Sequence, residues 1–226
     1  GDIGGAFGTK GPQYVEHRLT LWASEKLKRP VKWTCERSEA IQADEHGRDV
    51  IFEAELALDV DHNFIGFRAS STNNVGAYIS SMRNIQAGFG NIGGIVGVYD
   101  IPAAYVAVTG AMTNTNSTAP YRGAGRPEAS YVIERLIDEA AREIHIDPAE
   151  LRRQNFILPE DLPYQTSLVF NYDSGDFPTV MEKALAMSDY AGFAGRREAS
   201  DQIGKLRGIG TANPIERSAS PSPDYA

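Results

Sequence analysis

Ala119-Pro-Tyr-Arg-Gly-Ala-Gly-Arg-Pro-Glu128 is the most informative stretch of this chain, because two glycines and two arginines stand directly before a predicted helix start. Gly123 and Gly125 carry no Cβ, so the backbone there can approach another group closely. The guanidinium of Arg122 offers a planar set of donors that suits a phosphate or an oxyanion. Pro127 favours the first position of a helix. The stretch predicts a donor-rich turn that runs into a helix, although a plain glycine turn before a surface helix has the same pattern.

A second glycine-rich turn, Gly4-Gly-Ala-Phe-Gly-Thr-Lys-Gly11, precedes a helical pattern over residues 12–28. That pattern places four apolar side chains on one stripe: Val15, Leu19, Trp22 and Leu27. A helix start behind a glycine-rich turn presents free N–H groups to anions. The turn is not a P-loop, because no Gly-Lys-Ser/Thr follows at the required spacing, and it lacks the Gly-x-Gly-x-x-Gly fingerprint.

Together the two turns resemble the cofactor motifs of the molybdenum-binding large subunit of the xanthine dehydrogenase and aldehyde oxidase family. Gly4 to Lys10 is similar to the first motif of that family. Pro120 to Glu128 is similar to the second, in the version carried by form II carbon monoxide dehydrogenase-like proteins. Four further stretches support the resemblance: Arg29-Pro-Val-Lys-Trp33, Asn74-Val-Gly-Ala-Tyr78, Tyr99-Asp-Ile-Pro102 and Glu150-Leu-Arg-Arg-Gln-Asn155.

The resemblance implies a molybdenum–pterin cofactor, in its cytosine dinucleotide form, and oxidation of an aldehyde or an N-heterocycle with water as the oxygen source. Phe7 and Gly8 would belong to a turn whose backbone N–H approaches a molybdenum oxygen, and Arg122 would be the catalytic arginine beside the metal. Electrons would pass to a [2Fe–2S] small subunit and an FAD-binding medium subunit. The cofactor-binding positions implied in this way are Gly5, Ala6, Phe7, Gly8, Arg122, Gly123, Ala124 and Gly125.

Three departures from the family pattern bear on the substrate. In true aerobic carbon monoxide dehydrogenase a cysteine that carries copper follows the motif arginine, whereas this chain has Gly123. A thiolate is the natural ligand of Cu(I), so oxidation of carbon monoxide is not expected. Xanthine oxidase-like members carry a phenylalanine where Ala124 stands, and xanthine dehydrogenases carry a glutamate where Gly11 stands. The expected substrate is therefore neither carbon monoxide nor a purine.

The general base of the family, a glutamate in a Gly-x-Gly-Glu context near the end of the full subunit, has no counterpart in this sequence. Glu128 and Glu134 lie after the second motif and could be considered instead. A structural or helix-surface role is favoured for both. The chain therefore holds one part of the site without its general base.

Composition excludes several other classes of protein. With 226 residues, 42% hydrophobic and 23% charged, the chain is ordinary for a globular protein of one large or two small domains. A net charge of −8 argues against nucleic acid as a partner, and no apolar run approaches the roughly 18 residues of a membrane span. The lone cysteine, Cys35, excludes an internal disulfide and fits a reducing compartment, so a cytoplasmic location is expected. No pair of histidines has metal-ligand spacing, so no protein-ligated metal is expected.

Hydrophobic periodicity predicts an α+β fold with a mixed or antiparallel sheet and packed helices. The predicted strands are 31–36 (with Val31, Trp33 and Cys35 inward), 49–60, 64–75 and 103–112, with a turn at 61–63. The predicted helices are 12–28, a turn capped by Ser38, 127–145, one starting at Asp147 and one from Asp176 to Met187. Residues 79–98 are predicted to form a loop with a short helix that lines a site, and residues 160–175 a plain loop.

Residues 1–205 are expected to form the first part of the molybdenum cofactor-binding domain, and residues 206–226 to start the following segment with a strand near Leu206. The ends look cut, so the chain is interpreted as a piece of a large subunit whose remainder is its first partner. The competing hypothesis is a folded structural or interaction module that is inactive and cofactor-free in isolation. A third is an unrelated anion-binding module built on two glycine turns.

Overall fold

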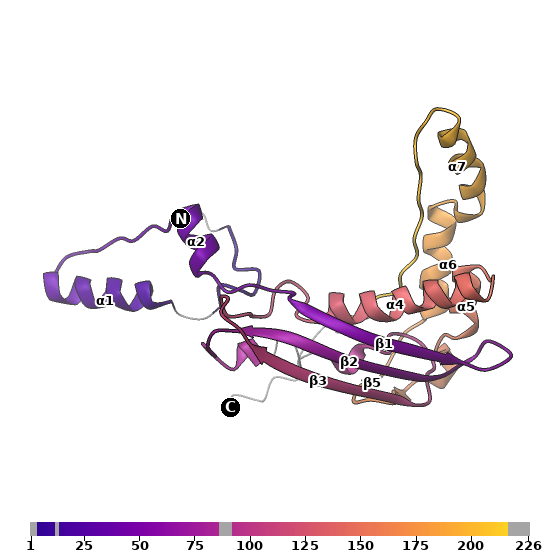
Figure 1. Ribbon diagram of the computed structural model, residues 1–226, viewed down its shortest axis with the longest axis horizontal. Coiled ribbons are helices and arrows are strands. Elements are labelled where there is room, and N and C mark those ends of the chain that lie inside the picture. Colours follow the sequence, from indigo (N-terminus) through magenta and orange to yellow (C-terminus); the bar gives the residue numbers. More distant parts are fainter. Residues whose placement is uncertain (1–3, 12–13, 86–91, 217–226) are drawn as a thin grey trace. The chain divides into compact units, whose positions relative to one another are not determined.

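The computed structural model describes residues 4–11, 14–85 and 92–216 (Figure 1). The chain divides into two compact units. The first unit draws on residues 1–52, 70–92 and 107–125, and the second on residues 53–69, 93–106 and 126–226. Both glycine-rich turns lie in the first unit, up to Gly125. Parts of the first helix, of the 79–98 loop and of the C-terminal segment fall outside the described residues.

Three strands form the main sheet in the order β1-β2-β3, as Figure 1 shows. Their bounds are β1 Val50–Leu58, β2 Phe64–Gly76 and β3 Ala104–Met112. All three were predicted. Along β1 every second side chain is partly buried, as the alternation requires, so the predicted inward face is confirmed: it carries Phe52, Ala54, Leu56 and Leu58.

The sheet is mixed, as the hydrogen bonds between its strands show. β1 and β2 form an antiparallel hairpin whose turn is held by the Asp59 carboxylate, which accepts from the backbone N–H of Asp61 and of Asn63 at 2.9 Å each. On the other side of β2, the paired residue numbers rise in the same direction along β2 and β3. The Phe67 N–H donates to the Ala103 carbonyl, and the Thr113 N–H donates to the Gly76 carbonyl. Ascending pairs of this kind belong to a parallel arrangement.

The first unit also contains α1 (Val15–Leu27) and α2 (Arg37–Ala43). The α1 helix was predicted, yet none of its side chains is buried, and its apolar stripe is exposed. The cap of α2 is not Ser38: Glu36 accepts from the backbone of the third helical residue, and the Glu39 side chain accepts from the Glu36 N–H at 2.9 Å.

The predicted strand at 31–36 is wrong. Those residues have no strand structure, Trp33 is exposed, and Val31 and Cys35 are only half-buried. Alternation is a local pattern, whereas a strand also needs a neighbour to receive its backbone hydrogen bonds, and the sheet has the order β1-β2-β3 without this segment. Cys35 is therefore not the core residue that the alternation predicted.

The second unit is rich in helices. Its α-helices are α4 Arg126–Glu143, α5 Pro148–Gln154, α6 Phe177–Met187 and α7 Phe193–Asp201. Short 3-10 turns are η1 Ile92–Gly94, η2 Pro159–Asp161 and η3 Tyr190–Gly192; Ile92 itself is assigned to the first unit. The predicted caps are confirmed at Asp147, which accepts from the Ala149 N–H at 2.8 Å, and at Asp176, which accepts from the Thr179 N–H at 3.0 Å.

Two predictions for the second unit need correction. The supposed plain loop at 160–175 contains an antiparallel pair, β4 (Tyr164–Gln165) with β5 (Asn171–Tyr172). Residues 205–216 contain no strand, although a strand was predicted near Leu206, and α7 was not predicted at all. An extended segment such as residues 206–211 becomes a strand only if another strand offers it a pairing edge.

The core of the second unit forms around Tyr99. Its ring packs edge-on against Phe64 of β2 at 5.7 Å between centroids and stacks on Phe156 at 5.5 Å. Its hydroxyl donates to Glu134 of α4 at 2.7 Å. Tyr99 thereby joins α4 to β2, in agreement with the predicted packing of this helix on the sheet. The buried face of α4 consists of Ala129, Val132, Ile133, Glu134, Ile137 and Ala141.

Across the described ranges, every helix is too short or too polar to cross a membrane.

Candidate cofactor-binding site

The two glycine-rich turns, far apart in sequence, are in direct contact. The backbone N–H of Arg122 donates to the carbonyl oxygen of Phe7 at 2.9 Å. Next to this bond Gly8 has φ +98°, and a Cβ at Gly8 would overlap the carbonyl oxygen of Pro120. The close approach of two backbones therefore requires glycine at position 8. The family resemblance puts both turns at one cofactor, and the contact between Phe7 and Arg122 agrees with that expectation.

The second turn has an unusual backbone. Gly123, Ala124 and Gly125 have φ values of +93°, +48° and +93°, and the Ala124 N–H donates to the Tyr121 carbonyl at 2.8 Å. The left-handed region is open to glycine and strained for alanine. The two glycines are thus required by conformation, and the strain at Ala124 is held in place by the surrounding contacts.

Arg48 braces the second turn. Its guanidinium donates to the Arg122 carbonyl and lies over the Tyr121 ring, 4.8 Å from the centroid. A Cβ at Gly47 would come within 2.6 Å of the Tyr121 Cβ, so this tyrosine packs directly on the chain beside Arg48. Both the N–H and the carbonyl of Arg122 are held in this way, while the residue as a whole remains exposed.

The first turn closes on itself. The Lys10 N–H donates to the Ala6 carbonyl at 3.4 Å, and the Gly11 N–H donates to the Gly8 carbonyl at 3.3 Å. Gly5 and Phe7 have φ values of +99° and +50°, and the Phe7 side chain is exposed.

The orientation of the Gly8 N–H follows from the bond to Arg122. The Phe7–Gly8 peptide is trans, so its N–H points away from its carbonyl. Because the Phe7 carbonyl is directed at Arg122, the Gly8 N–H is directed to the opposite side of the peptide. Among the described residues no hydrogen bond uses this donor. The site thus offers an oriented backbone N–H beside an arginine.

A polar cluster beneath the turns was not found from the sequence. The Arg83 guanidinium donates to the Gly8 carbonyl at 2.7 Å. The buried Asn84 donates from its side-chain amide to the Thr118 carbonyl and, at 3.2 Å, to the carboxylate of Glu45. The only signal for this cluster was the polar, small-residue composition of 79–98. In the described part of this segment Arg83 and Asn84 contact the chain at Gly8 and Thr118, while residues 86–91 lie outside the described residues; that the segment lines a site stays a prediction.

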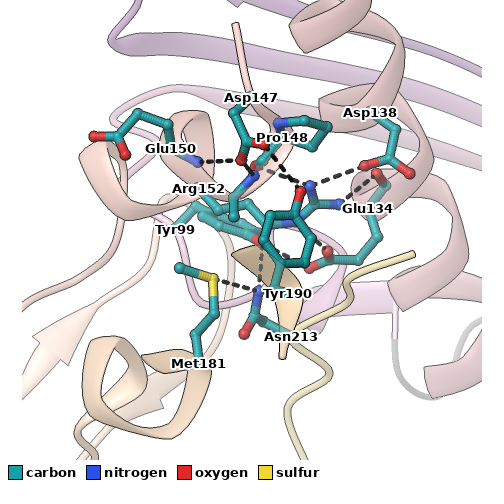
Figure 2. A network of polar contacts seen from close by, with 11 residues as sticks. Tyr99, Glu134, Asp138, Asp147, Pro148, Glu150, Arg152, Met181, Tyr190 and Asn213 are labelled. Carbon is teal, nitrogen blue, oxygen red and sulfur yellow. Dashed lines mark hydrogen bonds and ion pairs between the residues drawn. The ribbon is translucent and has the colours of Figure 1, made fainter. Parts of the chain in front are cut away.

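Glu134 is a structural residue. As Figure 2 shows, it faces the fully buried Arg152, whose Nε donates to the Glu134 carboxylate at 2.8 Å, while Arg152 Nη1 lies 2.9 Å from Asp138. Burial alone would lower the pKa of Arg152, but the charge of Glu134 raises it above its ordinary value. Burial, and then the charge of Glu134, raise the pKa of Tyr99 well above its ordinary value. A carboxylate held by two such partners is not placed to act as a base.

The described residues contain no cluster of three or more His, Cys, Asp or Glu side chains that could ligate a metal. Cys35 makes a poor thiolate, because partial burial and the charges of Glu39 and Asp44 raise the pKa of its thiol. Position 123, where a copper-carrying cysteine would stand by the family resemblance, is glycine.

Comparison with known proteins agrees with this geometry. Residues 1–156 match the family model of the molybdopterin cofactor-binding domain. The carbon monoxide dehydrogenase large chain of Hydrogenophaga pseudoflava is 38% identical over 216 residues, which cover 92% of this chain and 27% of that protein. The nicotine 6-hydroxylase large subunit of Paenarthrobacter nicotinovorans is 31% identical and is matched over 96% of this chain and 27% of its own length.

A solved structure supports the same family relationship. Quinoline 2-oxidoreductase from Pseudomonas putida 86 superposes with a TM-score of 0.82 at 31% identity, over 90% of this chain and 26% of that one. The chain belongs to the molybdopterin cofactor-binding domain family, within the group of molybdenum-binding large subunits that includes carbon monoxide and xanthine dehydrogenases. It spans about a quarter of the length of the relatives it matches.

Proposed function

We propose that this chain supplies one wall of a molybdenum–pterin site in a hydroxylase that oxidises an N-heterocycle or an aldehyde with water as the oxygen source. The observation that carries the proposal is the contact between the Phe7 carbonyl and the Arg122 N–H, which brings both motif turns to one place. The cofactor would be the cytosine dinucleotide form.

The residues present fit such a group. The described residues offer no ligand cluster for a bare metal ion, so a metal at this place would have to arrive with its own organic ligands. The donors at the turns are a backbone N–H at Gly8 and the guanidinium of Arg122, which suit an anionic group. The missing Cβ at Gly8 lets the two turns pack against each other at Pro120, and Gly123 and Gly125 adopt positive φ values that glycine allows.

When bound, the cofactor would supply the two-electron oxidation of an electron-poor carbon. The protein's part is placement and electrostatics. The Gly8 N–H would donate to the bound group, and the Arg122 side chain would stabilise negative charge that develops during the reaction. Residues 4–11 and 121–125 contain no carboxylate or histidine that could move a proton, and a structural role is favoured for Glu128, which follows in α4. The general base therefore comes from another part of the protein.

The nature of the substrate follows from position 123. Two of the relatives have names that refer to N-heterocycles, quinoline and nicotine, and one refers to carbon monoxide. Copper-dependent oxidation of carbon monoxide needs a thiolate at the turn, and Gly123 offers none. An N-heterocycle or aldehyde is accordingly favoured. The electrons would leave through a [2Fe–2S] subunit and an FAD subunit, in the cytoplasm.

The test is dye reduction by the whole complex, with its molybdenum content measured in the same preparation. We expect stoichiometric molybdenum, turnover with an N-heterocycle or aldehyde, and none with carbon monoxide. Absence of molybdenum would refute the proposal as a whole. Turnover with carbon monoxide would refute the substrate assignment alone.

A further inference from the structure

We propose that Arg83 and Asn84 are positioning residues that hold the two cofactor turns in register, each residue fixing one turn. The inference rests on the proposed function, because the turns matter only if they face a common group. Neither residue is part of a cofactor motif. We refer to the pair as the Arg83–Asn84 clamp.

Arg83 fixes the first turn. Its Nη2 donates to the Gly8 carbonyl at 2.7 Å, a charge-assisted bond to the residue whose N–H would serve the cofactor under the proposed function. A Cβ at Gly11 would lie 2.9 Å from Arg83 Cζ, so the guanidinium also fills the place beside that glycine. Gly11 and Arg83 therefore form a matched pair, because a larger residue at position 11 would displace the guanidinium from Gly8.

Asn84 fixes the second turn. It is 2% exposed, and its amide donates to the carbonyl of Thr118, two residues before Pro120. Its side-chain oxygen accepts from the Ser81 N–H at 2.8 Å. With its oxygen and nitrogen both engaged, the amide has one orientation, and the carbonyl that it holds is fixed with it.

The two contacts come from neighbouring residues on one helical turn. One short segment therefore reaches both the Gly8 carbonyl and the Thr118 carbonyl, with one side chain for each. The buried Glu45 accepts from Asn84 and from Ser80, while its second oxygen has no hydrogen-bond partner among the described residues. A buried carboxylate oxygen without a partner costs free energy, so the cluster is not arranged for stability alone. This favours a role of the cluster in geometry.

The experiment uses the whole large subunit in its complex. Arg83→Met removes the hydrogen-bond donor to Gly8, and Arg83→Lys keeps a charged donor group. Gly11→Ala displaces the guanidinium without changing it. Arg68→Met is the matched control, since Arg68 is an exposed arginine of β2 paired only with the exposed Glu55. Amide hydrogen exchange is followed in peptides over residues 4–11 and 114–125, together with molybdenum content and turnover per bound molybdenum.

We expect Arg83→Met to speed exchange in the first turn by about ten- to a hundredfold, the range for loss of a charge-assisted hydrogen bond, with the second turn unchanged. Gly11→Ala should do the same more weakly and add little to Arg83→Met. Asn84→Ala should reverse the pattern and speed exchange at residues 117–119. Turnover per bound molybdenum should fall at least about tenfold in Arg83→Met and recover partly in Arg83→Lys.

Unchanged exchange in the first turn of Arg83→Met would overturn the clamp, as would faster exchange with normal turnover per molybdenum. If Asn84→Ala fails to fold, the Arg83 and Gly11 variants decide. A wild-type complex without molybdenum would refute the proposed function, and the exchange data alone would then show whether these residues hold the turns.

Discussion

Arg122 donates its backbone N–H to the carbonyl of Phe7 at 2.9 Å, and this one bond ties the two motif turns together. It explains why position 8 is glycine, since a side chain there would overlap Pro120. It also fixes the direction of the Gly8 N–H through the planarity of the peptide. The bond is made by the backbone, so substitution of the Arg122 side chain leaves it available.

Arg122→Ala in the whole complex should therefore lower turnover while the cofactor stays bound. Loss of one preorganised donor to developing negative charge reduces kcat by about 10²- to 10³-fold. The measurement is dye reduction per bound molybdenum. Cys35→Ser is the comparison variant and should keep nearly full turnover, because the thiol donates to the neighbouring Glu36 carbonyl and serine can make the same bond. Wild-type turnover in Arg122→Ala would contradict the assignment.

Gly8→Ala should separate the two turns. The new Cβ would overlap the Pro120 carbonyl oxygen and sit on a backbone with φ +98°, which together should destabilise the turn by about 2 kcal/mol or more. Gly4→Ala is the matched control, because nothing lies within 4 Å of a Cβ at Gly4. We expect molybdenum content to fall in Gly8→Ala and to remain normal in Gly4→Ala. Equal contents in the two variants would count against the contact.

Arg152→Met should destabilise the protein strongly. It would leave the carboxylates of Glu134 and Asp138 without their buried cation, a change that typically costs about 3–5 kcal/mol. Arg153→Met on the same helix removes only partly exposed ion pairs with Glu150 and Glu182 and should cost less than about 1 kcal/mol. Melting temperatures of the two variants test this. Similar shifts in melting temperature would show that the buried Arg152 cluster contributes no more to stability than the ion pairs of Arg153.

Stability should fall at high pH, with Tyr172 as one source. Burial raises the pKa of Tyr172 to about 12 from an ordinary value near 10. Above the lower value the unfolded chain loses this proton while the folded chain keeps it. The contribution is therefore complete below about pH 10 and is lost as the pH rises toward 12, by of order 1–2 kcal/mol.

Thermal melts between pH 8 and pH 11 measure this effect. Tyr172→Phe should flatten the alkaline decline and, because the hydroxyl also donates to the Gly97 carbonyl at 2.7 Å, lower stability at pH 8. Tyr105→Phe, at an exposed position of β3, is the comparison. An alkaline decline that is the same in both variants would exclude Tyr172 as its source.

The 226-residue chain by itself should be inactive and free of molybdenum. The absent general base alone would cost a factor of about 10² to 10⁴. Elemental analysis and dye reduction of the purified chain test this. Stoichiometric molybdenum in the isolated chain would show that the described turns are enough to retain the cofactor. The domain boundary expected at residue 205 stays a prediction.

The sequence predicted correctly those elements whose signals lie within a few neighbouring residues. Asp147 and Asp176 begin helices because an aspartate cap and a proline act within one helical turn. The β1–β2 hairpin was predictable from alternation on both sides of a short polar turn. The strand expected at 31–36 failed for the opposite reason: its alternation is correct, but no neighbouring strand pairs with it.

The sequence by itself determined the two motifs, their order and the conformations that their glycines permit, because these depend on residue type and on short-range sterics. Only the tertiary structure decided that Phe7 meets Arg122, that Arg83 and Asn84 brace the two turns, and that Glu134 is held by Arg152. These pairs join segments brought together by packing of the whole chain. Periodicity and caps carry no information about partners tens of residues away, so such contacts become visible only in the folded molecule.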